Sequence, residues 1–183
     1  SQAWMYALMA CEPVAIDSME IPIVEKAKAY TSNLTNWELV YDYPFELKNK
    51  TMSHVWRNKE QKSGLIAMKG AAEGVLQVCK MTSEQRSESV KKLSELSSQG
   101  KRVLGLAAKT LESNGIRSDD EKDLNFIGFL VYSDPIRENV KEAIESCQSA
   151  DIQIKMLTGD HLLTAHAIAD QIGLVHSHQF LFT

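Results

Sequence analysis

Apolar and polar residues alternate in several short segments of the first part of the chain. Apolar or aromatic side chains occupy every second position over residues 37–43 and again over 52–56, and residues 65–68 and 102–109 have a similar strand-like character. A period of two is typical of a strand with one buried face. Because these strands cluster along the chain, we predict an α+β fold with an antiparallel sheet flanked by helices.

A helical pattern separates the third and fourth of these strands. Residues 82–99 repeat apolar positions at helical spacing, and Gly100 follows as a natural end. Thr82 and Gln85 have the spacing of a capping box, in which each residue bonds to the other's backbone. Further along, residues 112–123 are polar, so we predict a loop there.

From residue 124 onward the pattern changes to strand, helix, strand, helix. Residues 126–132 form the nearly continuous apolar run of a buried parallel strand, and residues 140–147 form a helix with Cys147 on its apolar face. Residues 152–156 alternate like a strand. Apolar residues at helical spacing over residues 165–172 predict a last helix, which Gly173 would end. The predicted domains are therefore residues 1–123, an α+β domain, and residues 124–183, part of an α/β domain.

Composition excludes several classes of protein. The chain has 183 residues, of which 44% are apolar, which is enough for one core or two small ones. Its net charge of −4 argues against a nucleic-acid surface, and no apolar run approaches the roughly 20 residues that span a bilayer. The three cysteines are widely spaced, which favours reduced thiols over a disulfide framework or a zinc site.

Two of the predicted strands in the second region end in loops that carry an aspartate. Asp134 follows the first strand, and Asp160 follows the second in the run Thr158-Gly159-Asp160. Loops at the carboxyl ends of neighbouring parallel strands lie at one edge of a sheet, so both carboxylates could face a common phosphate or magnesium ion. The alternatives are an ordinary turn at Asp134 and a plain helix cap at Thr158 or Asp160.

Three motifs together resemble the signature motifs of P-type ATPases. In order along the chain they are Lys69-Gly70-Ala71-Ala72-Glu73, Asp134-Pro135-Ile136-Arg137 and Thr158-Gly159-Asp160-His161. They are similar to the K-G-A-P-E, D-P-P-R and T-G-D-N motifs of that family. The resemblance implies a nucleotide-binding domain followed by a partial, haloacid-dehalogenase-like phosphorylation domain, closest to the type II, calcium-pump-like group.

The resemblance implies a site for ATP on the first domain. Phe45 matches the aromatic residue that stacks on adenine, Arg102 matches an arginine that reaches the phosphates, and Glu20 matches an acidic residue at the adenine edge. The remaining matches, all close to the nucleotide in the family, are Lys50, Lys69, Gly70 and Ala71. An aromatic platform contributes on the order of 1–3 kcal/mol per stacked base. The alternatives are that Phe45 is ordinary core and that the cationic side chains are solvated surface charges.

The resemblance also implies catalytic roles in the second domain. Asp134 and Arg137 would lie beside the nucleotide and its phosphates, while Thr158, Gly159 and Asp160 would surround the phosphorylated aspartate and its Mg²⁺. In the intact pump, ATP would transfer its γ-phosphoryl group to that aspartate, and the phosphoenzyme would drive cation transport.

Four positions depart from the family motifs. Ala72 replaces a proline, Ile136 replaces a second proline, and His161 replaces an asparagine. Leu47 stands where many relatives have an arginine that contacts phosphate, so we expect weaker nucleotide binding.

The family's D-K-T-G-T motif, which carries the phosphorylated aspartate, is absent from the sequence. We therefore expect a fragment that binds ATP but does not itself form the phosphoenzyme, that belongs to the cytoplasmic portion of an integral membrane protein, and whose partner is the rest of the same pump. The alternatives are a stand-alone nucleotide-binding module and a haloacid-dehalogenase-like phosphatase. The phosphatase is disfavoured because Asp17 does not follow the apolar strand that its nucleophile needs.

Overall fold

The computed structural model describes residues 2–14, 17–61, 63–133, 136–159 and 162–174. These residues form two compact units. The first unit comprises residues 1–88 and 104–130, and the second comprises residues 89–103 and 131–183. Among the described residues, no helix has both the length and the apolar character needed to cross a bilayer.

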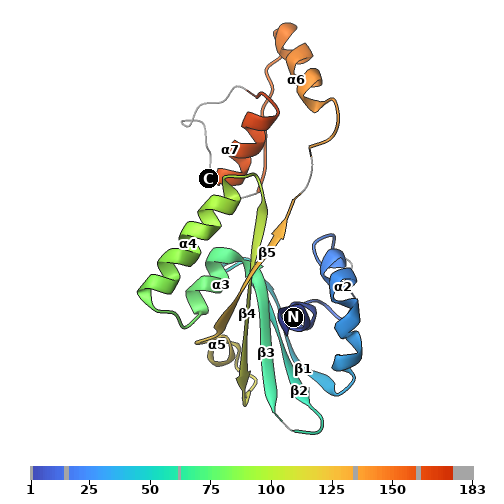
Figure 1. Ribbon diagram of the computed structural model, residues 1–183, viewed down its shortest axis with the longest axis vertical. Coiled ribbons are helices and arrows are strands. Elements are labelled where there is room, and N and C mark those ends of the chain that lie inside the picture. The colour runs from blue at the N-terminus through green and yellow to red at the C-terminus, as the bar shows by residue number, and fades with distance from the viewer. Residues whose placement is uncertain (1, 15–16, 62, 134–135, 160–161, 175–183) are drawn as a thin grey trace. The chain divides into compact units, whose positions relative to one another are not determined.

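A five-stranded sheet with the strands in chain order organises the structure (Figure 1). The strands are β1 (Trp37–Glu46), β2 (Thr51–Asn58), β3 (Gly64–Ala71), β4 (Arg102–Leu111) and β5 (Asn125–Tyr132). β1 pairs antiparallel with β2, β2 with β3, and β3 with β4, and β5 lies next to β4 at the edge. The predicted α+β fold with an antiparallel sheet is therefore confirmed, and the four alternating segments are its first four strands.

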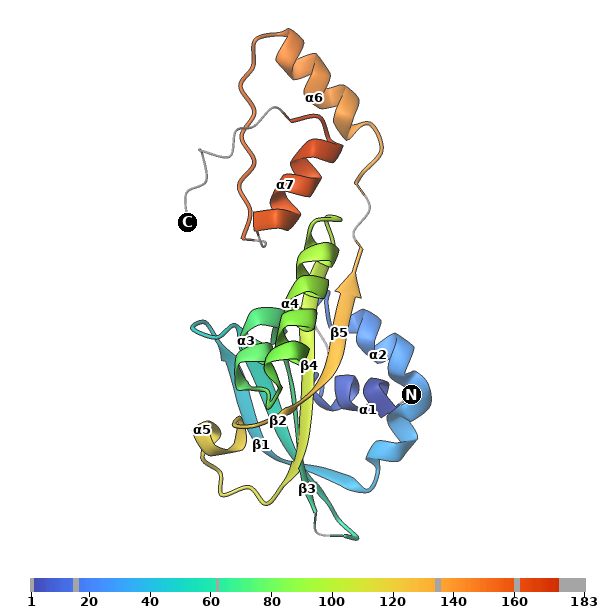
Figure 2. The same cartoon turned by 60° about the vertical axis from the view of Figure 1, so that its left-hand side comes forward.

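Helices cover both faces of this sheet in the first unit (Figures 1 and 2). The helical segments are α1 (Gln2–Met9), α2 (Ile21–Ala27), the 3₁₀ helix η1 (Lys28–Leu34), α3 (Ala72–Val78) and the short α5 (Arg117–Asp120). On one face, the side chains of His54 and Trp56 reach the carbonyl oxygen of Met9 at the end of α1. On the other face, Val75 of α3 packs into the main core.

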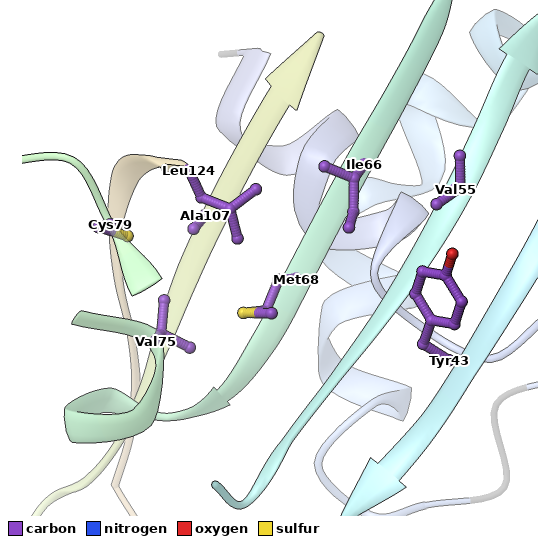
Figure 3. Close-up of a cluster of buried hydrophobic side chains, with 8 residues drawn as sticks. All are labelled: Tyr43, Val55, Ile66, Met68, Val75, Cys79, Ala107 and Leu124. Atoms are coloured by element: carbon purple, nitrogen blue, oxygen red, sulfur yellow. The ribbon is translucent and has the colours of Figure 1, made fainter. Parts of the chain in front are cut away.

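The main core lies between α3 and the sheet (Figure 3). Its buried members are Tyr43, Val55, Ile66, Met68, Val75, Cys79, Ala107 and Leu124. Gly105 lets α3 approach β4, because a Cβ at residue 105 would lie 2.7 Å from the Cβ of Val75. Close packing of this kind leaves no room for one further methyl group.

The second unit contains most of α4 (Ser83–Ser97) together with α6 (Val140–Ser149) and α7 (Leu162–Gln171).

The predicted capping box at the start of α4 is confirmed. The Thr82 hydroxyl accepts from the Gln85 N–H at 3.2 Å, and the Gln85 side chain accepts from the Thr82 N–H at 3.0 Å. Past the end of α4, the carbonyl oxygen of Lys101 accepts a hydrogen bond from the Thr164 hydroxyl of α7 at 3.2 Å.

The predicted strand over residues 152–156 is wrong, because these residues have no regular secondary structure. Ile154 and Met156 are half-buried between exposed neighbours, so the alternation in burial is retained. A strand also needs a neighbouring backbone to satisfy its amide groups. The described residues of this unit between 136 and 174 supply no strand for it to pair with.

Three further expectations need correction. β5 is the terminal strand of the five-stranded sheet, with half-buried rather than buried residues, so it is not a buried parallel strand. The position of Cys147 on the apolar face of α6 predicts a core residue, but Cys147 is half-buried and Ile144 is the buried residue of this helix. The polar segment 112–123 contains α5 and two buried carboxylates rather than a simple solvated loop. The α/β character of residues 124–183 stays a prediction.

Candidate nucleotide site

Strand register brings four backbone segments together at one end of the sheet. Glu46 of β1 lies opposite Thr51 of β2, Thr51 lies opposite Gly70 of β3, and Gly70 lies opposite Gly105 of β4. The predicted site residues Phe45, Lys50 and Lys69 immediately precede the first three of these positions. Segments that are well separated in sequence are therefore adjacent here.

Lys69 forms a buried ion pair with Glu20. The Nζ atom of Lys69 donates to Oε1 of Glu20 at 2.6 Å, and the two side chains are only 4% and 5% exposed. The same Nζ lies 2.8 Å from the sulfur of Met52, the residue opposite Lys69 in the register. The alternative that Lys69 is a solvated surface charge is therefore wrong.

The local sequence explains how Glu20 is placed. The Asp17 carboxylate accepts from the Met19 N–H at 2.6 Å, and the Asp17 carbonyl accepts from the Glu20 N–H at 3.0 Å, which makes a tight turn. Pro22 lies in the first turn of α2, where its missing N–H costs nothing. Glu20 is the N-cap residue of α2, but its carboxylate makes no cap hydrogen bond and is directed to Lys69 instead.

One oxygen of this buried carboxylate has no hydrogen-bond partner among the described residues. Oε1 of Glu20 accepts from both Lys69 and the backbone N–H of Glu12, the latter at 3.1 Å, whereas Oε2 is buried without a partner. An unmatched buried acceptor of this kind costs on the order of 1–3 kcal/mol. The site therefore has an acceptor that a ligand's N–H group could satisfy.

Phe45 and Leu47 expose apolar surface near the end of β1. The Phe45 side chain is 54% exposed and Leu47 is 83% exposed. The alternative that Phe45 is ordinary core is therefore wrong. Lys50, in the turn between β1 and β2, is also exposed and has a positive φ of 52°.

Gly70 is required by the packing of this turn. A Cβ at residue 70 would lie 2.3 Å from the carbonyl oxygen of Lys50, and the φ of Gly70 is 157°. The same carbonyl oxygen accepts from the N–H of Ala71 at 2.8 Å. The chain itself makes the close approach to Gly70, so a small residue is needed there whether or not a nucleotide is bound.

The other predicted site residues belong to the second unit. Arg102 is the first residue of β4 and is exposed. Arg137, Thr158 and Gly159 are exposed in irregular segments. Asp134 and Asp160 lie outside the described residues, so the proximity of their two loops stays a prediction.

Sequence reasoning missed two groups that complete this site. Met52 was placed on a strand, but its contact with the Lys69 ammonium depends on the register of β2 and β3. The Glu12 N–H, which bonds to Glu20, comes from a loop that carries no motif. A register deduced from the alternation of both strands is the signal that could have identified Met52.

A family model described as P-type ATPase, cytoplasmic domain N, matches residues 14–139. That match covers most of the chain and includes Glu20, Lys69 and the first four strands of the sheet. The chain belongs to the P-type ATPase family. This P-type ATPase domain therefore has the architecture that its motifs predicted, and the sheet with its flanking helices is the cytoplasmic N domain.

Curated P-type ATPases with different named ions match this domain at similar identity. A probable cation-transporting P-type ATPase of Mycoplasma genitalium is 32% identical over 87% of the chain and 18% of its own length. A calcium-transporting ATPase of Bacillus subtilis is 30% identical over 77% of the chain and 17% of its own length. A sodium/potassium-transporting ATPase alpha subunit of Artemia franciscana is 30% identical over 87% of the chain and 18% of its own length. The P-type ATPase domain thus spans less than a fifth of these relatives.

Proposed function

We propose that this domain binds ATP at the Glu20–Lys69 end of its sheet and, in the intact pump, presents it to a phosphorylatable aspartate outside this chain. The observation that supports this most directly is the buried Oε2 atom of Glu20, which has no partner among the described residues. The exocyclic amino group of adenine is a donor that would satisfy this oxygen. A donor at this position offsets the cost of burying the carboxylate.

Phe45 would provide the stacking surface for the base. A half-exposed aromatic side chain at a strand end is available to a planar ligand, and Phe45 is 54% exposed. Stacking of a base on such a ring contributes on the order of 1–3 kcal/mol. Lys50 would contribute positive charge beside the nucleotide, and Gly70 and Ala71 would keep the β3 backbone accessible.

Lys69 would hold the Glu20 carboxylate in one orientation. Their ion pair, at 2.6 Å and buried on both sides, uses Oε1 and leaves Oε2 for a donor on the ligand. Arg102, from the second unit, would bind the phosphates. The role of Lys69 rests on the family resemblance and its ion pair with Glu20, and that of Arg102 rests on the family resemblance.

In the intact pump we propose that the second region takes part in phosphoryl transfer. Asp134 and Arg137 would orient the nucleotide and its phosphates, while Thr158, Gly159 and Asp160 would line the position of the phosphorylated aspartate. Carboxylate oxygens such as those of Asp160 suit Mg²⁺, which neutralises developing charge during transfer. The proposed domains are residues 1–123 for nucleotide binding and 124–183 for the partial phosphorylation domain.

The intact protein would then be a cation-transporting ATPase in which the rest of the pump polypeptide is the partner of this domain. The 183 residues contain no D-K-T-G-T motif. We therefore expect the isolated chain to bind ATP without hydrolysing it.

Titration of the chain with ATP and with GTP, followed by backbone amide shifts, tests the proposal. We expect ATP to bind more tightly, because guanine presents a carbonyl oxygen toward Oε2 of Glu20 where adenine presents a donor. Glu20→Gln should reduce or reverse this preference, since an amide can donate to guanine. Equal binding of both nucleotides by the unmodified chain would contradict the proposed role of Glu20.

Two surface variants isolate the stacking and phosphate contributions. Phe45→Ala should weaken ATP binding about tenfold, consistent with the loss of one stacked base. Ile116→Ala is the matched control, because Ile116 is 52% exposed in the same unit and lies on no predicted ligand contact. Leu47→Arg should strengthen ATP binding several-fold by adding a charge-assisted bond, and added salt should remove that gain.

A further inference from the structure

A second group of charged side chains lies on the same face of the sheet as Lys69. Glu12, from the segment after α1, Asp42 of β1 and His54 of β2 each offer one ligand atom, and these atoms lie within 4.8 Å of one another. Asp42 and His54 are directly opposite in the strand register, so their side chains project from the same face. No part of the proposed nucleotide site uses these three side chains.

The hydrogen bonding of His54 fixes which ring nitrogen carries a proton. Nδ1 of His54 lies 3.1 Å from the carbonyl oxygen of Met9, and a carbonyl oxygen can only accept. Nδ1 must therefore be the protonated nitrogen. The same oxygen accepts from the Trp56 indole at 2.8 Å, so Met9 and β2 hold the imidazole ring in one orientation.

The other ring nitrogen then faces a carboxylate with nothing between them. Nε2 of His54 lies 3.3 Å from Oδ1 of Asp42 and has no hydrogen-bond partner among the described residues. The His54 side chain is 0% exposed, whereas Asp42 is 47% exposed. A buried nitrogen lone pair beside a carboxylate is favourable only if a cation lies between them, either a second proton on the ring or a metal ion.

We propose that Glu12, Asp42 and His54 bind a divalent transition-metal ion of the zinc type. One imidazole and two carboxylates, with water in the fourth position, is a donor set that suits Zn²⁺, while Mg²⁺ and Ca²⁺ prefer oxygen ligands alone. Two ligand atoms held about 2.0–2.1 Å from a tetrahedral ion lie about 3.3 Å apart. The Nε2–Oδ1 separation of 3.3 Å has this value.

The surroundings of the cluster fit a metal site in two further ways. A metal-binding histidine usually donates its second N–H to a carbonyl or carboxylate, as His54 does to Met9. The half-exposed Asp42 gives an ion access from solvent. Glu12 bonds to Glu20 through its backbone N–H, so substitution of the Glu12 side chain removes a ligand and leaves the nucleotide site's hydrogen bond in place.

Titration of the full chain with Zn²⁺ alone, without nucleotide, tests this proposal. The readouts are isothermal calorimetry and the ¹⁵N shifts of the His54 ring. We expect saturable binding of one ion at His54, with Nε2 taking the shift of a metal-bound nitrogen, and no competition from millimolar Mg²⁺. Glu12→Gln and Asp42→Asn should each weaken this binding at least tenfold and leave the chain folded.

Glu38→Gln is the matched control, because Glu38 is an exposed carboxylate on the same strand as Asp42. It should leave zinc binding unchanged. The proposal fails if Nε2 carries a proton that Zn²⁺ does not displace at neutral pH, which would mean that a His54–Asp42 ion pair fills the cluster. It also fails if zinc binds with unchanged affinity in both carboxamide variants, which would indicate adventitious binding at other histidines. Neither result bears on the ATP titration, so the two proposals are tested separately.

Discussion

Two buried charged clusters lie on opposite faces of the same sheet and differ in how completely their carboxylates are satisfied. On one face, Glu20 pairs with Lys69 and keeps one oxygen without a partner among the described residues. On the other face, Asp120 accepts from the hydroxyls of Tyr43 and Ser113. The two clusters lie on opposite faces because successive side chains of a strand point to opposite sides of the sheet. Met52, opposite Lys69, and Ser53, opposite Tyr43, are such successive residues of β2.

The cluster of Asp120 and Glu121 holds the segment between β4 and β5 against the sheet. Glu121 accepts from the Ser53 hydroxyl at 2.7 Å and from the Arg117 guanidinium at 3.0 Å. Arg117 also lies over the ring of Tyr43, 5.8 Å from its centroid, and donates to the carbonyl oxygen of Pro44. Asp120 and Glu121 each accept from two side chains among the described residues, as expected for a cluster whose role is structural.

The comparison shows that burial of charge does not by itself mark a binding site. Both clusters bury carboxylates, and both draw residues from distant parts of the sequence. They differ in whether an acceptor is left without a donor in the described chain. A satisfied cluster rigidifies the fold, whereas an unsatisfied one favours a ligand that completes it.

The largest expected effect comes from removing one member of the buried ion pair. Lys69→Met leaves the Glu20 carboxylate buried without its cation, which should lower the free energy of unfolding by about 3–5 kcal/mol. Urea denaturation measures this loss. The double variant Lys69→Met/Glu20→Gln should recover much of it, while Lys48→Met, at an exposed lysine, should change stability by less than about 0.5 kcal/mol. Equal stability of the single and double variants would contradict the explanation that the loss comes from a buried Glu20 carboxylate without its cation.

A smaller loss is expected in the satisfied cluster. Asp120→Asn weakens the acceptor for the Tyr43 and Ser113 hydroxyls and should cost about 1–3 kcal/mol. ATP affinity should remain unchanged in conditions where the variant is folded. Asp119→Asn, at the exposed neighbour, is the control and should be close to neutral. A loss of ATP binding in folded Asp120→Asn would contradict the structural role of this cluster.

The last expected effect is a pH dependence from Tyr43, which is absent at neutral pH and develops only above pH 10. Burial of the ring and its hydrogen bond to Asp120 raise the pKa of Tyr43 from 10 to about 12. The unfolded chain therefore loses this proton first, so stability from the neutral phenol is complete below pH 10 and declines as pH rises through about 12.

The difference in unfolding free energy between the unmodified chain and Tyr43→Phe measures this contribution. We expect the difference to shrink between pH 10 and 12, because phenylalanine has no proton to lose. The raised pKa values of Cys11 and Cys79 are present in both proteins, so their contributions cancel in the difference. A difference that stays constant over this range would mean that Tyr43 ionises equally in the folded and unfolded states.

Particular elements show how far sequence reasoning reached. The alternation over residues 37–43 and 52–56 predicted β1 and β2, and the spacing of Thr82 and Gln85 predicted the cap of α4. These features depend on neighbouring residues, so a local pattern contains them. The same alternation over residues 152–156 did not produce a strand, because a strand also needs a partner that the local pattern does not specify.

Sequence reasoning alone reached the family, the positions of the first four strands along the chain and the residues that the family resemblance assigns to ATP. It could not decide whether Lys69 was a surface charge or half of a buried pair, nor that Glu12, Asp42 and His54 would meet. Those outcomes depend on the register of β1, β2 and β3 and on how the segment after α1 lies across them. Tertiary structure decided them because burial and proximity arise from contacts between distant segments, and those contacts set the free energy of each charge.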